Sequence, residues 1–151
     1  PYYLALADLD GDGRLDIAVP NYGSSNVSVL RNTNTVGAAI SSSSLATKVD
    51  FTTGSNPVPA ILGDIDGDGK IDITVGNYGG NSISVLRNTA TSGAITSSSF
   101  ASKVDFASSN NPWDGAGADF DGDGKLDIIS LSYSTQTFSI FKNTATSGSI
   151  A

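Results

Sequence analysis

Short runs of alternating apolar and polar residues cover the chain, separated by turns rich in Gly, Asn and Ser. In residues 71–75 the Ile and Val side chains fall on one face, and Asp72 and Thr74 fall on the other, which is the period of a half-buried β-strand. Residues 83–86 predict a second strand, and residues 100–106 predict a third that carries aromatic side chains. No segment requires a helix, so the pattern predicts an all-β chain.

The same order of segments occurs three times. A nine-residue motif, Asp-x-Asp-Gly-Asp-Gly-x-x-Asp, recurs at intervals of 56 and 55 residues and occupies residues 8–16, 64–72 and 119–127. A short strand of small residues precedes each motif, as expected where strands crowd near a central axis, at residues 4–7, 60–63 and 115–118. We therefore divide the chain into three repeats, at residues 1–56, 57–111 and 112–151.

Four short strands in each repeat of about 55 residues predict the blades of a β-propeller, which closes with about four to eight blades. The third repeat lacks its outer strand, because residues 147–151 align with residues 92–96. We expect a part of a larger propeller, or two chains that close a six-bladed ring, since uncovered blade faces and a free strand edge favour association. A linear β-solenoid and separate thrombospondin-type calcium repeats are alternatives.

The Asp motif predicts a calcium site in each repeat. Its carboxylates stand at alternate positions, and the glycines let the backbone curl so that the oxygens converge. The predicted ligands are four side chains and one backbone carbonyl per loop: Asp8, Asp10, Asp12, Asp16 and the Arg14 carbonyl; Asp64, Asp66, Asp68, Asp72 and the Lys70 carbonyl; Asp119, Asp121, Asp123, Asp127 and the Lys125 carbonyl.

Metal-free Asp-Gly turns are the alternative, but four like charges within nine residues repel one another unless a cation neutralises them. An EF-hand requires flanking helices and a bidentate Glu at position twelve, where this chain has Val19, Val75 and Ser130. Magnesium is disfavoured because it usually retains several waters. We therefore expect about one Ca²⁺ per repeat.

The composition argues against nucleic-acid binding, a transmembrane helix and catalysis. The net charge is −7, every acidic residue is Asp, and twelve of the fifteen lie in the three motifs, while the eight Lys and Arg form no basic stripe. We therefore expect no nucleic-acid partner. No apolar run approaches the roughly 20 residues of a transmembrane helix. The chain has no His, Cys or Glu, so common general bases and nucleophiles are missing and we expect no enzyme.

The Asp loop between a small-residue strand and an Ile-Asp-Ile strand resembles the FG-GAP/VCBS repeats of integrin-type propellers, and the resemblance covers all three repeats. It implies a calcium ion between the first two strands of each blade, a secreted or cell-surface location, and ligands on the opposite face. The Phe-Gly and Gly-Ala-Pro signatures of that family are faint here, at residues 78–80 and 56–59. Integrin-like ligand recognition is therefore not implied.

Candidate ligand contacts lie in the loops away from the Asp motifs: Asn21, Tyr22, Asn77, Tyr78, Tyr133 and Trp113. Aromatic rings stack on apolar sugar faces and amides bond hydroxyls, so these residues suit a glycan or a cell-surface protein. The alternative is that the rings pack between blades. We expect an extracellular, lectin-like adhesion or ligand-binding scaffold; a purely structural segment and a fragment of a propeller-type polysaccharide-degrading enzyme are the other hypotheses.

Overall fold

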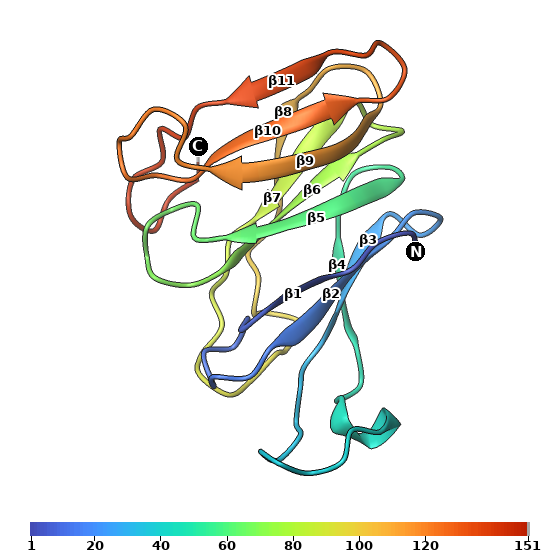
Figure 1. Cartoon of the computed structure of the whole chain (residues 1–151), viewed down its shortest axis with the longest axis vertical. Coiled ribbons are helices and arrows are strands. Elements are labelled where there is room, and N and C mark those ends of the chain that lie inside the picture. Colours follow the sequence, from blue (N-terminus) through green and yellow to red (C-terminus); the bar gives the residue numbers. More distant parts are fainter. Residues whose placement is uncertain (151) are drawn as a thin grey trace.

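In the computed structural model, which describes residues 1–150, the chain forms three antiparallel sheets stacked face to face (Figure 1). The first sheet is β1 (Ala5–Ala7), β2 (Asp16–Asn21), β3 (Asn26–Leu30) and β4 (Val49–Thr52). The second is β5 (Pro57–Gly63), β6 (Asp72–Asn77), β7 (Ser82–Leu86) and β8 (Val104–Ala107). The third is β9 (Pro112–Ala118), β10 (Asp127–Ser132) and β11 (Phe138–Phe141).

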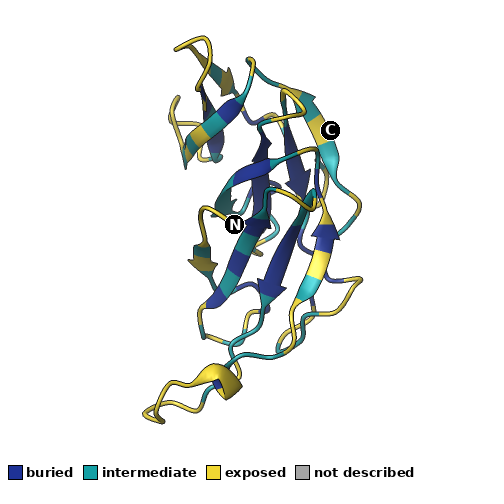
Figure 2. Ribbon diagram, turned by 90° about the vertical axis from the view of Figure 1, so that its right-hand side faces the viewer, coloured by how far each residue is buried: buried dark blue, intermediate teal, exposed yellow. Residues whose placement is uncertain are grey.

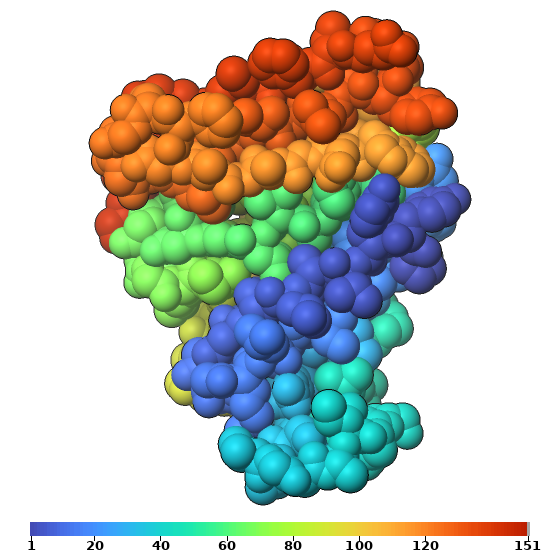
Figure 3. All heavy atoms as spheres, in the orientation of Figure 1, coloured from blue at the N-terminus to red at the C-terminus, as the bar shows by residue number. Residues whose placement is uncertain are grey.

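The predicted all-β class of propeller-type repeats is confirmed. Among residues 1–150 the only helical element is a single 3-10 turn, η1 (Ser42–Ser44), in the connection that projects from the first sheet (Figures 1 and 3). None of this part of the chain forms a helix long and apolar enough to cross a bilayer. The three sheets form a stack and do not close into a ring. The residue bounds of the repeats stay a prediction.

The outer strand differs from the expected continuous segment at residues 100–106. Only β8 pairs with β7 as a regular ladder, while Phe100 forms an isolated bridge with Asn88. The backbone of Ser99 and Ala101 bonds Thr89 and Arg87 instead, beyond the end of β7. This break turns the Phe100 ring inward, where it packs edge-on against Phe51 with the ring centres 4.9 Å apart. The aromatic residue therefore fills the space between two sheets.

Two apolar cores lie between the three sheets. The first joins the first and second sheets and includes Val27, Ile73 and Phe100, and the second joins the second and third sheets around Ile83 and Ile128. The second sheet is covered on both faces, and every residue of β6 is buried (Figure 2). Apolar burial between successive sheets is therefore the main cohesive force along the stack.

Two buried asparagines link neighbouring sheets by hydrogen bonds. The Asn88 side-chain amide donates to the Leu9 carbonyl of the first repeat and to the Ile71 carbonyl of its own, both at 2.8 Å. Asn143 repeats this arrangement one sheet later, donating to Ile65 at 2.7 Å and to Leu126 at 3.1 Å. The equivalent Asn32 has no preceding sheet to contact in this structure and bonds Leu15 at 3.1 Å. These amides fix how successive sheets align.

The third sheet has three strands, as predicted. Its last strand, β11, is an edge, and the outward-facing Phe138 and Ile140 are 63% and 56% exposed. The equivalent Ile83 and Val85 of β7 are each only 3% exposed, because the third sheet covers them. The contrast marks the outer face of the third sheet as an uncovered blade surface.

We expect Asn88→Ala to lower the free energy of unfolding by about 2–4 kcal/mol, because two buried carbonyls and one amide lose their partner. Urea denaturation measures the effect. Asn32→Ala is the matched control, and it should cost under about 1 kcal/mol since its carbonyl partner is exposed. Equal losses in the two variants would contradict a role in aligning the sheets.

Candidate metal centre

The three Asp motifs form the loops that join β1 to β2, β5 to β6 and β9 to β10, all on one side of the stack (Figure 1, left). In each loop the first aspartate caps the turn with both carboxylate oxygens. Asp64 accepts hydrogen bonds from the backbone of Gly67 at 2.8 Å, Asp68 at 3.1 Å and Gly69 at 2.8 Å. Asp8 and Asp119 accept equivalent bonds. The carboxylate therefore shapes the loop by accepting hydrogen bonds from backbone amides of the turn.

The two glycines of each loop adopt backbone angles that other residues avoid. In the second loop Gly67 and Gly69 have φ of +71° and +87°. Left-handed φ is nearly free for glycine and strained for residues with a Cβ. The Asp-Gly-Asp-Gly spacing is thus what lets alternate carboxylates turn toward one point.

The last aspartate of each loop holds two separate parts of the backbone. Asp72 accepts from Ile65 at 2.9 Å and from Asn88 at 2.7 Å, so the loop is tied to the residue that aligns the sheets. Asp16 bonds Leu9 and Asn32 in the same way, and Asp127 bonds Phe120 and Asn143. This double contact explains why an aspartate stands at the ninth position of each motif.

Three carboxylates converge in each loop, with ligand atoms that all lie within 4.8 Å of one another. The clusters are Asp8, Asp10 and Asp16; Asp64, Asp66 and Asp72; and Asp119, Asp121 and Asp127. The prediction that these nine side chains come together therefore matches the geometry. The clusters could hold a metal ion, since hard divalent cations bind carboxylate oxygens.

The aspartate at position five of each motif lies outside these clusters. The Asp12 carboxylate accepts from the Arg14 amide at 3.0 Å and pairs with the guanidinium groups of Arg14 and Arg31. Asp68 and Asp123 accept the corresponding bonds from Lys70 and Lys125. These three carboxylates, and the carbonyls of Arg14, Lys70 and Lys125, stay predicted ligands.

Burial raises the free energy of the charged form of the carboxylates in these clusters. Desolvation raises the pKa of the fully buried Asp72 to about 6, despite the backbone bonds from Asn88 and Ile65 that lower it. Desolvation also raises the pKa of Asp66, with the charge of Asp68 acting in the same direction, and the pKa of Asp16. The third cluster is more open, because Asp119 and Asp121 are exposed. A bound cation would stabilise the charged carboxylates in all three.

One atom of the second cluster lacks a hydrogen-bond partner in the described chain. Asp66 Oδ2 is buried without a donor, and its closest cationic group, Arg87 Nη1, lies 3.9 Å away. A buried carboxylate oxygen without a donor is expensive. A divalent cation coordinated by Asp64, Asp66 and Asp72 would satisfy it, so the donor set fits a metal such as calcium.

A basic residue beside each cluster was not singled out from the sequence as part of the site. Arg31 bonds Asp10 and Asp12, Arg87 approaches Asp66, and Lys142 pairs with Asp121 and Asp123. These residues occupy the same position of the repeat, in Leu-Arg-Asn-Thr or Phe-Lys-Asn-Thr. That recurrence was the signal from which the basic residue could have been assigned to the site. The Asn that follows it in the same motif is the residue that aligns the sheets.

The predicted ligand contacts form an aromatic cluster at the other end of the sheets, near the N-terminus and the β2–β3 turn (Figure 1, right). The Trp113 ring centre lies 5.5 Å from Tyr78 and 5.7 Å from Tyr133, and Tyr22 lies 6.1 Å from Tyr78. Tyr2 joins the cluster, 5.4 Å from Tyr22, and was not predicted. Rings that are far apart in the sequence thus share one surface.

The two asparagines predicted beside these rings lie differently. Asn77 is completely buried, and its amide donates to Ser82 at 3.0 Å and to Ser84 at 2.8 Å. Asn21 makes the equivalent bonds to Asn26 and Ser28 at 2.8 and 2.7 Å. Both amides therefore hold hairpins together, and their donor groups are engaged within the chain.

A family model described as an FG-GAP-like repeat matches the chain twice, at residues 8–75 and 64–130. Comparison with curated proteins and with solved structures found no match. The two matches overlap, each spans two Asp motifs, and together they cover most of the chain, in agreement with the loops and four-stranded sheets described above. The chain belongs to the FG-GAP-like repeat family.

Proposed function

We propose that the chain is a calcium-stabilised extracellular scaffold that binds a glycan on its aromatic surface. The observation that carries the proposal is the aromatic cluster of Tyr22, Tyr78, Trp113 and Tyr133, which draws rings from all three repeats onto one surface. The carboxylate clusters lie at the other end of the same sheets. This arrangement supports a rigid scaffold that binds ions at one end and a ligand at the other.

Calcium is the proposed ion because each cluster offers several carboxylate oxygens on a flexible glycine loop. Three divalent ions would cancel six of the seven net negative charges. We expect affinities of the extracellular kind, about 10⁻⁴ to 10⁻³ M. The buried and unpaired Asp66 Oδ2 supports the second loop in particular.

The aromatic surface has the chemistry that sugars require. Tyr133 is 68% exposed, and Tyr2 also presents most of its surface to solvent. Within residues 1–150 no protein group bonds a tyrosine hydroxyl of this cluster or the Trp113 indole nitrogen. Ring faces can stack on apolar sugar faces while these free polar tips bond sugar hydroxyls. Repetition across the sheets would add avidity.

We expect Trp113→Ala and Tyr133→Ala to reduce retention on a glycan array at least tenfold, because each removes a stacking ring. Phe120→Ala is the matched control, since Phe120 is 60% exposed but lies in an Asp loop at the other end. Retention by the control should be unchanged.

The structural-scaffold hypothesis predicts a different result for the same variants. The parent protein would be retained on no glycan, and Trp113→Ala would lose about 3–5 kcal/mol of stability, as for a truncated core aromatic. That outcome would refute the binding role.

A non-enzymatic role fits the side chains available. The chain has no His, Cys or Glu, and twelve of its fifteen aspartates belong to the Asp loops. An acid–base pair would have to come from Asp50, Asp105 or Asp114. Asp50 and Asp105 are engaged by Lys48 and Lys103. A fragment of a polysaccharide-degrading propeller is the remaining enzymatic hypothesis, with its catalytic groups in other blades.

We propose further that two chains associate through their uncovered blade faces. The third sheet exposes Phe138 and Ile140, and the first exposes Leu4 and Leu6. Exposed apolar patches at the two ends of a stack favour pairing, and three blades plus three would give a six-bladed ring.

Light scattering should therefore give twice the chain mass of 15.3 kDa. Phe138→Ser should shift the molecule toward monomer, because it adds a polar group to the proposed contact. A folded monomer at every concentration would contradict the pairing.

A further inference from the structure

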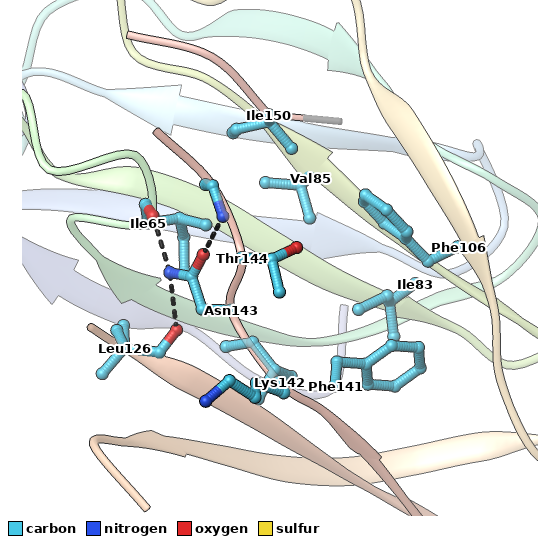
Figure 4. Close-up of a pocket in the computed structure, with 12 residues that line it drawn as sticks. Ile65, Ile83, Val85, Phe106, Leu126, Phe141, Lys142, Asn143, Thr144 and Ile150 are labelled. Atoms are coloured by element: carbon cyan, nitrogen blue, oxygen red, sulfur yellow. Dashed lines mark hydrogen bonds between the residues drawn. The ribbon is translucent and has the colours of Figure 1, made fainter. Parts of the chain in front are cut away.

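The basic residue beside each carboxylate cluster begins at the same place in every repeat. Arg31, Arg87 and Lys142 each stand directly before an asparagine, and the backbone amide of that asparagine donates to the last aspartate of the loop. Figure 4 shows Lys142 beside Asn143 in the third repeat. The backbone position of the basic residue is therefore equivalent in the three repeats, and its side-chain contacts can be compared.

In the first loop the basic side chain holds a carboxylate of the cluster. Arg31 Nε donates to Asp10 Oδ2 at 2.5 Å, and Arg31 Nη2 donates to Asp12 Oδ2 at 3.0 Å. Arg14 pairs with the same oxygen of Asp12. Asp10 is one of the three aspartates that converge in this loop, and its side chain is completely buried. Two guanidinium groups therefore neutralise part of the negative charge of the first loop.

The second loop has the same carboxylates without these ion pairs. Arg87 Nη1 lies 3.9 Å from Asp66 Oδ2, too far for a hydrogen bond, and this oxygen is the buried atom without a donor. Lys70 stands where the first loop has Arg14, and within residues 1–150 no basic side chain pairs with Asp68. The oxygen that Arg31 holds in the first loop thus has no donor in the second.

The first and second loops are matched in other respects. In both, the backbone amide at position five donates to Oδ1 of the aspartate at position three, at 3.2 and 3.1 Å, so the Oδ2 atoms of Asp10 and Asp66 correspond. Both of these side chains are completely buried. A serine hydroxyl of the following repeat donates to each loop, at the carbonyls of Gly11 and Gly67. The contacts of the two arginines are therefore the clearest difference between the clusters.

We propose that Arg31 is a built-in counter-cation of the first loop, which competes with the divalent ion for Asp10, so that the second loop binds this ion more tightly than the first. The inference rests on the calcium sites of the proposed function. An ion that enters the first loop has to displace hydrogen bonds between charged groups, which are stronger than neutral ones. In the second loop the ion satisfies an oxygen that has no donor. The second loop therefore fills first.

An orienting role for Arg31 is the alternative, and it makes the opposite prediction. A guanidinium that positions Asp10 for the ion would raise the affinity of the first loop, and its removal would lower that affinity. Competition is favoured because Arg31 bonds Oδ2, whereas Oδ1 of Asp10 already accepts from the Asp12 amide. The arginine thus holds the oxygen that is otherwise available to an ion.

Lys142 makes a weaker form of the same contact in the third loop. It pairs with Asp121 and Asp123, but the side chains of Lys142 and Asp121 are both exposed to water. Exposed ion pairs contribute little free energy, because water screens them. Displacement of Lys142 therefore costs less than displacement of Arg31, and the comparison between the first and second loops is the informative one.

A calcium titration of the full chain, followed by backbone amide signals in heteronuclear NMR, reports each loop separately. The amides of Gly13 and Gly69 hold equivalent positions and donate to the first aspartate of their loops. We expect the Gly69 signal to reach its midpoint at a calcium concentration about tenfold below that of Gly13. Equal midpoints would overturn the proposal and leave the calcium sites in place. If neither signal moved, both the calcium sites and the competition would be wrong.

Arg31→Gln should lower the Gly13 midpoint about tenfold, toward that of Gly69, because the competing hydrogen bonds are gone. Arg87→Gln is the matched control, since it removes the same charge from the equivalent position but no hydrogen bond to Asp66. It should change the Gly69 midpoint by less than about threefold. An unchanged or higher Gly13 midpoint in Arg31→Gln would show that the arginine does not compete with the ion.

Thermal unfolding in chelator gives a readout that needs no ion. Arg31→Gln should melt several degrees below the parent protein there, because Asp10 and Asp12 lose their counter-charge, and calcium should close most of this gap. Arg31→Lys serves if the glutamine variant does not fold, because it keeps the charge and loses the two-point contact. Its Gly13 midpoint should also fall below that of the parent. A stability deficit that calcium leaves unchanged would contradict the counter-cation role.

Discussion

The hydrogen bonds of the last aspartate in each loop are the interaction on which the rest of the structure depends. Asp16 accepts from Leu9, whose carbonyl accepts from Asn88, and Asn88 in turn donates to Asp72 through its backbone. Asp72 accepts from Ile65, whose carbonyl accepts from Asn143, and Asn143 donates to Asp127. One continuous chain of hydrogen bonds therefore crosses all three sheets and joins the three carboxylate clusters.

This connection makes the three carboxylate clusters part of the contact between the sheets. The last aspartate of each loop is buried, and desolvation is the largest cause that raises the pKa of Asp72 to about 6, with the charge of Asp66 acting in the same direction. A cation at the cluster would keep the carboxylate charged and its backbone bonds strong. The rings of Tyr22, Tyr78 and Trp113 meet at the other end of the same sheets.

The sequence allowed much of this to be predicted because the repeat is nearly regular. The all-β class, the three-stranded last sheet and the convergence of Asp64, Asp66 and Asp72 follow from strand period and from glycine spacing. Contacts between repeats were harder to predict from the sequence, because they depend on how the sheets stack. Nothing local indicated that Asn77 would be buried inside a hairpin, or that Phe100 would leave the ladder to fill an inter-sheet space. The sequence showed the Arg31 position only as a basic residue that recurs at the same place in each repeat.

Calorimetric unfolding in chelator and in millimolar calcium tests the central claim most directly, because an ion that binds only the native state raises its melting temperature. We predict a higher melting temperature in calcium, a smaller rise in Asp66→Asn, and an unchanged rise in the control Asp105→Asn, whose carboxylate lies outside the loops. Identical unfolding curves with and without calcium would contradict the account.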